Sequence, residues 1–309
     1  MDKKNIGFFY DFDLTLSEEF QQYPIFREYW FSLFTYYGIR QPDNYWRLSD
    51  GSDLGIGYME QMIKDAPKIF NGLTNKLMKE KFGPQIKLAP NIPKWFENIN
   101  NFCAVNNVDS EHHVISLGIL PLIEGTAVFR YLSSVNAGEF IDNEESIVEI
   151  KNAISPFRKV EYIKRICKGK DLYDNLELDE YHLNYDCALV FGDGQSDLDM
   201  FRYVHQRGGV AVGVFEKGNK EAYEKAVSKL GSSVNYIVPR DYSSDSILEK
   251  VVQESVNDII NRNCDMDYEI IHKVKLKQLR NQQIKDIVLD HLEKCDSCKM
   301  RSEAKFYFC

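Results

Sequence analysis

The sequence has no long hydrophobic run, because no stretch approaches the roughly 18 consecutive apolar residues that a helix needs to span a bilayer. The N-terminal stretch MDKKNIGFFYDFD has only a short apolar segment, which acidic residues interrupt. It lacks the longer hydrophobic region and the small-residue cleavage site of a secretory signal peptide. We therefore expect a cytoplasmic protein with no membrane partner.

An excess of positive charge is also lacking. The 309 residues include 38 lysines and arginines against 47 aspartates and glutamates, so the net charge is −9 and the pI is near 5.3. This balance argues against general attraction to nucleic acids, although the segment KVKLKQLR is locally basic. There is no internal repeat or low-complexity segment. The length and the ordinary hydrophobic content predict a globular protein with one large domain or a core carrying an inserted module.

The cysteines do not form the regular, even-numbered pattern of a disulfide framework. There are seven of them, unevenly spaced, and reduced thiols fit this distribution better. Cys103, Cys167 and Cys187 lie in apolar surroundings and are predicted to be buried core residues.

The cysteines of the C-terminal tail, DHLEKCDSCKMRSEAKFYFC, need separate treatment. Cys295 and Cys298 form a C-x-x-C pair, and His291 and Cys309 are available to complete a tetrahedral Zn²⁺ site. A structural zinc at Cys295, Cys298 and Cys309 is therefore one hypothesis, although the usual second pair of ligands is absent. A redox pair is less favoured because no βαβ pattern follows. Exposed, inert thiols are the preferred interpretation.

Short β-rich apolar runs recur along the chain and are predicted to be strands. Several are apolar at consecutive positions, which is typical of strands buried on both faces of a parallel sheet. Helical patterns such as KVEYIKRIC and NKEAYEKAVSKL separate them. The alternation predicts a doubly wound, Rossmann-like α/β core with a parallel sheet. The predicted strands are Ile6–Tyr10, His113–Leu117, Cys187–Phe191, Gly209–Phe215 and Val234–Val238.

One connection, residues 17–112, is too long to be a loop. It contains aromatic-rich stretches such as YPIFREYWFSLFTYYGI and NYWRL and is predicted to be an inserted helical cap. Its aromatic stripe is expected to form the core of the cap, since amphipathic helices need such a face. Residues 1–16 and 113–250 are assigned to the α/β core.

Residues 251–309 are predicted to form C-terminal helices and a cysteine-containing tail. The stretches DSILEKVVQESVNDIINR and YEIIHKVKLKQLRNQQIKDIVLDHLEKC both have the pattern of long amphipathic helices. The first is expected to pack on the core. The second is expected to dock on the core, on a second subunit or on a partner, so an oligomer formed through it is one of the alternatives.

Polar side chains directly follow three of the predicted strands. In an open parallel sheet, ligands bind beyond the carboxyl ends of the strands, so these side chains are expected to share one edge. The first strand is followed by DFDLT, the second ends in VISLG, and the third is followed by GDGQSD. The residues concerned are Asp11, Asp13, Ser116, Asp193 and Asp197.

Four carboxylates and one lysine, Lys159, can gather at one place only if a cation offsets the repulsion and the desolvation of the carboxylates. Mg²⁺ takes oxygen ligands and commonly acts on phosphates, so a phosphate is the expected reacting group. Asp11 can then attack phosphorus and form an aspartyl-phosphate. Asp13 can protonate the leaving oxygen and afterwards activate water.

These stretches resemble the four motifs of the haloacid dehalogenase superfamily, specifically its Asp-x-Asp phosphatases similar to phosphoserine phosphatase. DFDLT resembles the first motif, VISLG the second and GDGQSDLDM the fourth, and they occur in family order between the N-terminus and about Leu248. Lys159 resembles the single lysine of the third motif, for which Lys164 and Lys151 are competing candidates.

The resemblance implies a role for each matching residue. Asp11 would be the nucleophile and Asp13 the general acid/base, while Ser116 and Lys159 would hold the phosphoryl oxygens. Asp11, the backbone carbonyl of Asp13, and Asp193 would bind Mg²⁺, with Mn²⁺ as the alternative ion. Asp197 would support the water shell of the metal or the lysine.

The second aspartate of DFDLT narrows the expected reaction. A halide leaves without a proton, so dehalogenases of the superfamily lack this residue, and its ATPases have Lys-Thr after the nucleophile. Hydrolysis of a small phosphomonoester is therefore the preferred function, with phosphotransfer to another hydroxyl next. An adaptor that binds a phosphorylated partner is the alternative from another class.

Three of these residues also have structural interpretations that the sequence leaves open. Asp197 is well placed to cap a helix over LDMFRYV. Ser116 has the character of a turn residue at the end of a strand, and Lys159 that of a solvated helix lysine.

Overall fold

The computed structural model describes residues 4–41, 44, 45, 48, 54–169, 175–177, 180–262, 268–275, 277, 278 and 281–308. The chain forms two compact units. The first unit comprises Met1–Phe9, Lys94–Glu111 and Ile163–Cys309, and the second comprises Tyr10–Pro93 and His112–Tyr162. Strands β1 (Asn5–Tyr10) and β2 (Asp109–Ile119) each run from one unit into the other.

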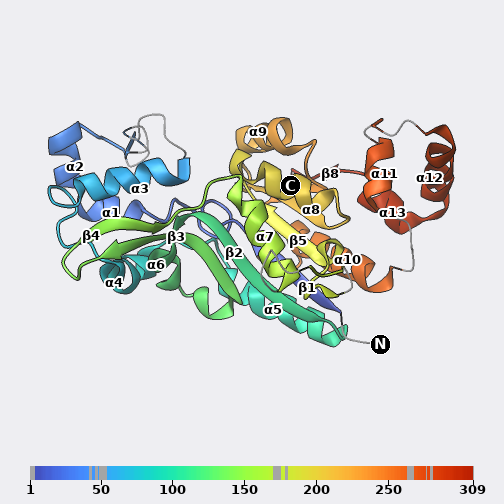
Figure 1. Cartoon of the computed structure of the whole chain (residues 1–309), viewed down its shortest axis with the longest axis horizontal. Coiled ribbons are helices and arrows are strands. Elements are labelled where there is room, and N and C mark those ends of the chain that lie inside the picture. Colours follow the sequence, from blue (N-terminus) through green and yellow to red (C-terminus); the bar gives the residue numbers. More distant parts are fainter. Residues whose placement is uncertain are drawn as a thin grey trace. The chain divides into compact units, whose positions relative to one another are not determined.

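The fold is α/β and Rossmann-like, with a mixed eight-stranded sheet in the hydrogen-bonded order β4-β3-β2-β1-β5-β6-β7-β8 (Figure 1). In the first unit, strands β5 to β8 pair in parallel. Every residue of β5, β6 and β7 is buried, so both faces of these strands are covered, as the consecutive apolar runs predicted. The strands are β5 (Ala188–Gly192), β6 (Val210–Phe215), β7 (Tyr236–Pro239) and β8 (Lys305–Phe306).

Helices of the first unit pack on these strands through one apolar face each. Helix α8 buries Met200, Phe201 and Val204. Helices α9 and α10 begin at side-chain caps, because Asn219 and Ser246 accept hydrogen bonds from backbone N–H groups of the first turn. These helices are α8 (Leu198–His205), α9 (Lys220–Leu230) and α10 (Ile247–Asn261), whereas α5 (Ile92–Val105) and α7 (Arg158–Lys168) each begin in the second unit and end in the first.

The last helices of the first unit have a separate small cluster of buried residues, made of Ile271, Val274, Val288, Leu292 and Cys298. Figure 1 shows these helices together, in orange and red. The prediction of one long helix here was wrong, since the segment contains the separate helices α11 and α12. The side chain of Asn281 accepts from two N–H groups at the start of α12, and this capping bond starts a new helix. The helices are α11 (Tyr268–Lys275), α12 (Gln282–Lys294) and α13 (Asp296–Arg301).

Two strands of the second unit, β3 (Ser134–Asp142) and β4 (Ile147–Asn152), were not predicted. Strand β3 pairs with β2 in parallel and with β4 antiparallel, so the sheet is mixed rather than purely parallel. Strand β4, with the sequence IVEIKN, has only one buried residue. It therefore lacks the continuous apolar run by which the other strands were recognised.

The inserted segment of the second unit is helical, and aromatic side chains form its core. The ring of Phe26 lies 4.8 Å from that of Tyr45 and 6.2 Å from that of Phe70 between centroids. Buried Asp65 accepts hydrogen bonds from the hydroxyls of Tyr37 and Tyr45 at 2.6 and 2.9 Å, so this polar group is satisfied inside the core. The helices of this segment in the second unit are α1 (Tyr23–Glu28), α2 (Trp30–Tyr37), α3 (Leu54–Asp65) and α4 (Asn75–Leu77), and α6 (Leu120–Glu124) follows β2.

The two units divide the chain differently from the predicted domains, because residues 112–162 group with residues 10–93. The assignment of 1–16 and 113–250 to the core, 17–112 to the cap and 251–309 to the C-terminal part stays a prediction. No helix in the described part of the chain has the length and apolar character needed to cross a membrane.

Acid should destabilise the protein through His112. This side chain is buried in β2 and lies 3.1 Å from the hydroxyl of Tyr10. Burial, with a smaller contribution from His113, lowers the pKa of His112 to about 3. In the unfolded chain, the imidazole of His112 takes up a proton near pH 6.5. The contribution of His112 to the free energy of unfolding should therefore fall by about 1.4 kcal/mol per pH unit between these values.

Urea unfolding at several pH values checks this prediction. The difference in stability between the parent and His112→Gln should shrink as the pH falls from 7 to 5. Val114→Ala, a cavity-forming control in the same strand, should differ from the parent by a constant amount. A difference for His112→Gln that does not vary with pH would contradict the assignment.

Candidate functional site

The stretch that follows β1 forms a tight turn around one carbonyl group. The N–H groups of Thr15, Leu16 and Ser17 all lie within hydrogen-bond distance of the carbonyl oxygen of Phe12, at 2.9 to 3.3 Å. Ser17 Oγ donates to the same oxygen and accepts from the N–H of Leu14, which has a positive φ of 56°. The turn fixes the backbone between the two aspartates and the cap.

Asp11 is paired with Lys159 inside the second unit. The Nζ atom of Lys159 lies 2.6 Å from Oδ1 of Asp11, and the lysine side chain is completely buried while that of Asp11 is 8% exposed. A buried ion pair at this distance costs desolvation of both groups, and removing either partner leaves the other charge uncompensated. The interpretation of Lys159 as a solvated helix lysine is therefore wrong.

The two competing lysines occupy different surroundings. Lys151 lies on β4 and pairs with Glu139 on the neighbouring strand at 2.5 Å, with a side chain that is 63% exposed. Lys164 lies over the ring of Tyr203 in the first unit, 5.0 Å from the centroid. Within the second unit, Lys159 is thus the lysine that contacts Asp11.

Asp13 and Ser116 are linked by one fully buried side chain, that of Gln21. The backbone N–H of Gln21 donates to Oδ1 of Asp13 at 2.8 Å, and its Nε2 lies 3.4 Å from both Oδ2 of Asp13 and Oγ of Ser116. Its Oε1 accepts from the N–H of Ile119 at 2.9 Å. The amide therefore positions the carboxylate of Asp13 relative to the end of β2.

Asp13 has the electrostatic surroundings of a proton carrier. Burial raises its pKa, the negative charge of Asp11 raises it further, and the hydrogen bonds from Gln21 and the charge of Lys159 oppose both effects. The resulting pKa is about 7. The carboxyl group of Asp13 is therefore able to exist in both protonation states near neutral pH.

Ser116 lies within β2, shortly before the strand ends at Ile119, and is 1% exposed. Its Oγ accepts from the N–H of Gly118 at 3.0 Å, which is a bond that a strand-end turn residue makes, so both interpretations of Ser116 agree with its contacts. Gly118 has a steric reason to be glycine. A Cβ atom there would lie 1.6 Å from Nε2 of Gln21.

Tyr58 brings helix α3 of the inserted segment toward Asp13. Its hydroxyl donates to the carbonyl oxygen of Leu117 at 2.8 Å, and its side chain is buried. Burial raises the pKa of Tyr58, and the negative charge of Asp13 adds to this effect. Tyr58 thus stays a neutral hydrogen-bond donor within the electrostatic field of Asp13.

The remaining carboxylates, Asp193 and Asp197, belong to the first unit and follow β5. Asp197 is fully buried, and its Oδ2 accepts from the N–H of Gly194 at 3.2 Å. This bond belongs to a capping box of the short 3-10 turn Gln195–Asp197, whereas Asp197 makes no side-chain capping bond to α8. Gly192 makes room for it, because a Cβ atom there would lie 2.3 Å from Oδ2 of Asp197.

Carboxylate oxygens are the type of ligand that Mg²⁺ prefers. Asp11 in the second unit carries a carboxylate, and so do Asp193 and Asp197 in the first. The chemistry of these side chains suits a hard divalent cation rather than a softer ion, which favours thiol and imidazole ligands.

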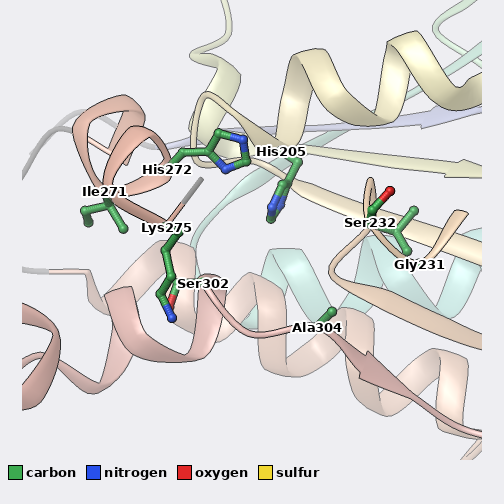
Figure 2. A pocket seen from close by; sticks show the side chains of 9 residues that line it. His205, Gly231, Ser232, Ile271, His272, Lys275, Ser302 and Ala304 are labelled. Carbon is green, nitrogen blue, oxygen red and sulfur yellow. The ribbon is translucent and has the colours of Figure 1, made fainter. Parts of the chain in front are cut away.

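A separate cavity of about 160 Å³ lies in the first unit. Figure 2 shows His205, His272, Lys275 and Ser302 around it. Burial lowers the pKa of both histidines, that of His205 to about 4. Two neutral imidazoles make a poor site for a phosphate, and the cavity contains none of the predicted site residues.

Sequence reasoning did not identify Gln21, Gly118 or Tyr58. Gln21 and Tyr58 lie in the segment that was predicted to be a cap from its length and its aromatic content, and neither belongs to a motif. The signal that could have identified Gly118 is its position two residues after Ser116, within VISLG. Only the folded geometry shows that this glycine accommodates the amide of Gln21.

Comparison with known proteins gave similarities to solved structures. A scan against family models and a search of curated proteins found no match. An apo phosphoserine phosphatase is 16% identical over 81% of this chain and 98% of its own, with a TM-score of 0.46. A phospho-aspartyl intermediate analogue of phosphoserine phosphatase is 16% identical over 82% and 99%, with a TM-score of 0.43. A haloacid dehalogenase family hydrolase from Salmonella enterica serovar Typhi is 14% identical over 72% and 66%, with a TM-score of 0.45. All three structures are at most 16% identical to this chain, with TM-scores below 0.5.

Proposed function

We propose that this protein is a Mg²⁺-dependent phosphatase of the haloacid dehalogenase superfamily that hydrolyses a small phosphomonoester through an aspartyl-phosphate on Asp11. The observation that carries the proposal is the buried 2.6 Å pair of Asp11 and Lys159, with Asp13 held by Gln21 in the same unit. A chain that only binds has no use for a second aspartate tuned to exchange protons beside the first.

The chain's own residues have the following roles in this reaction. Asp11 attacks phosphorus, so a bond from its carboxylate oxygen to phosphorus forms as the bond to the leaving oxygen breaks. Asp13 gives its proton to that leaving oxygen. Asp13 then removes a proton from water, which attacks the aspartyl-phosphate and releases phosphate and the free carboxylate of Asp11. Lys159 and Ser116 hold the phosphoryl oxygens throughout.

Asp11, Asp193, Asp197 and the backbone carbonyl of Asp13 would hold the Mg²⁺ ion. When bound, the ion supplies positive charge that offsets the charge of the phosphoryl oxygens and of the carboxylates. Mn²⁺ takes oxygen ligands as well and is the alternative ion.

The proposal extends to the surroundings of the site. The substrate is a small phosphorylated molecule, and the inserted helices exclude water and select it. We place the protein in the cytoplasm and regard oligomerisation through the C-terminal helices as a further prediction. Phosphotransfer differs from hydrolysis only in the acceptor, and partition of the phosphoryl group between water and added alcohols distinguishes the two.

The test is release of nitrophenolate and phosphate from 4-nitrophenyl phosphate with and without Mg²⁺. This leaving group departs without a proton, so Asp13→Asn should still form the aspartyl-phosphate but hydrolyse it slowly. We expect a burst of one equivalent of nitrophenolate, followed by turnover about a hundredfold below the parent. Intact-mass analysis after acid quenching should find one phosphoryl group on the protein.

Asp199→Asn is the matched control for this experiment. Asp199 lies on α8, where it is partly exposed and faces Arg202, and its replacement should leave turnover unchanged. No Mg²⁺-dependent release of phosphate from any small phosphomonoester would contradict the phosphatase and favour the adaptor.

The variant Gln21→Ala should show whether the Gln21 side chain positions Asp13 without taking part in the reaction itself. The variant keeps the backbone N–H bond to Asp13 but loses the side-chain contacts, and the N–H of Ile119 loses its acceptor. We expect kcat to fall about tenfold, KM to change little, and stability to fall by about 1–3 kcal/mol. Gly118→Ala should reproduce the fall in kcat, because its methyl group displaces the same amide. An unchanged kcat in both variants would contradict a positioning role.

A further inference from the structure

Three metal-binding side chains lie together in the C-terminal helices of the first unit. The ligand atoms of His291, Cys295 and Cys298 lie within 4.8 Å of one another. In a tetrahedral zinc site with bonds of about 2.0 to 2.3 Å, neighbouring ligand atoms are roughly 3.5 to 3.8 Å apart. Small side-chain rotations therefore suffice to bring the three atoms onto one ion.

The backbone explains why these side chains meet. His291 and Cys295 are four residues apart, so they occupy successive turns on one face. Helix α12 ends at Lys294, and the N–H of Cys295 donates to the carbonyl oxygen of His291 at 2.9 Å. Cys295 has an extended conformation, with φ −112° and ψ 98°, and α13 begins directly after it. The chain therefore changes direction between the two thiols.

The surroundings of the thiols are those of a structural site. Cys298 is 4% exposed and belongs to the small apolar cluster with Val288 and Leu292, against which Cys295 also packs. The interpretation of the tail thiols as exposed is thus wrong for Cys298. Five buried residues make a very small core, and helical modules with so few often gain stability from a bound metal.

We propose that His291, Cys295 and Cys298 bind a structural Zn²⁺ ion. Two thiolates and an imidazole are soft and borderline ligands that favour zinc over magnesium. Binding removes the proton from each thiol and takes His291 in its neutral form. Of the two residues that the sequence offered to complete the site, the geometry places His291 with the thiols, while Cys309 lies outside the residues that the structure describes. Water or a further side chain completes the tetrahedron.

The ion would fix the junction between α12 and α13, and with it the end of the chain. Strand β8 begins four residues after α13 and pairs with β7 through Lys305 opposite Tyr236. Ser302 and Ala304, in the intervening segment, line the cavity shown in Figure 2. The proposed zinc site is independent of the phosphatase chemistry.

Metal content of the full-length protein tests the proposal. Protein prepared with added zinc and dialysed without chelator should retain one zinc per chain by elemental mass spectrometry. Retention should fall below about a tenth of an equivalent in the double variant Cys295→Ser/Cys298→Ser and fall clearly in His291→Gln. Cys187→Ala, which removes a thiol of the same unit outside the cluster, should retain the full equivalent.

Cobalt identifies the ligands, because binding by thiolates produces intense near-ultraviolet absorption that carboxylates do not give. The absorption should appear in the parent and in Cys187→Ala and be absent from the double variant. Hydrogen exchange should show faster exchange of the α12 amides when a chelator removes the zinc. The same measurement on the other helices of the first unit shows whether each variant remains folded.

Two results would overturn the proposal. One is zinc retention that is negligible in the parent or equal in the parent and the double variant. The other is full retention of zinc in His291→Gln, because the proposed ligand set would then be complete without its imidazole.

Discussion

Replacing Asp11 by asparagine should lower Mg²⁺-dependent phosphate release by more than about a thousandfold, the size of loss that follows removal of a nucleophile. An amide is a poor nucleophile toward phosphorus and cannot form the aspartyl-phosphate. The loss should appear in single-turnover as well as in steady-state measurements, because bond formation itself is prevented. Steady-state and single-turnover rates with 4-nitrophenyl phosphate check this prediction.

The Asp11→Asn variant needs a stability control, because it leaves the ammonium group of Lys159 buried without its anion. Asp11→Glu provides it. This variant keeps the negative charge for Lys159 but moves the carboxylate by one methylene, so it should fold more stably than Asp11→Asn and still be inactive. Full activity in Asp11→Glu or in Asp11→Asn would contradict the assignment of Asp11 as the nucleophile.

The parallel part of the sheet was predictable because its strands are apolar at every position. Strands β5, β6 and β7 read as continuous hydrophobic runs, and such runs occur where both faces of a strand are covered. Strand β4 alternates and is mostly exposed, and β3 contains Asn136, Gly138 and Glu139. Their pairing depends on contacts between segments, which local pattern does not reveal.

The positions of Asp11, Asp13 and Asp193 in the fold were predictable because they follow apolar runs. The sequence places Asp11 and Asp13 after β1, and Asp193 after β5, without any knowledge of distant contacts. The contacts of Asp13 were not predictable in this way. They depend on Gln21, which lies eight residues away in a segment with no motif.

The C-terminal helices give a second example of structure that local sequence pattern does not reveal. A single amphipathic pattern over residues 268–295 predicted one helix, but Asn281 caps a second one. The break allows α11 and α12 to bury Ile271, Val274, Val288 and Leu292 against one another. Amphipathic periodicity alone cannot distinguish one long helix from two that fold back on each other.

Lys159→Met should be the most damaging change outside the nucleophile. It removes the ammonium group that lies 2.6 Å from Oδ1 of Asp11, while the carboxylate stays buried. We expect kcat/KM to fall by about a thousandfold, since the lysine both holds a phosphoryl oxygen and orients the nucleophile. Without Mg²⁺, the free energy of unfolding should fall by about 3–5 kcal/mol, the usual loss when one partner of a buried pair is removed.

Two comparisons make this prediction specific. Lys151→Met and Lys164→Met should keep the parent activity, because Lys151 pairs with Glu139 and Lys164 lies over the ring of Tyr203. The double variant Asp11→Asn/Lys159→Met should be more stable than Lys159→Met, since neither buried charge then lacks a partner. If Lys164→Met or Lys151→Met abolished turnover while Lys159→Met did not, the phosphate-binding lysine would be reassigned. The contact at Asp11 would then have a structural role.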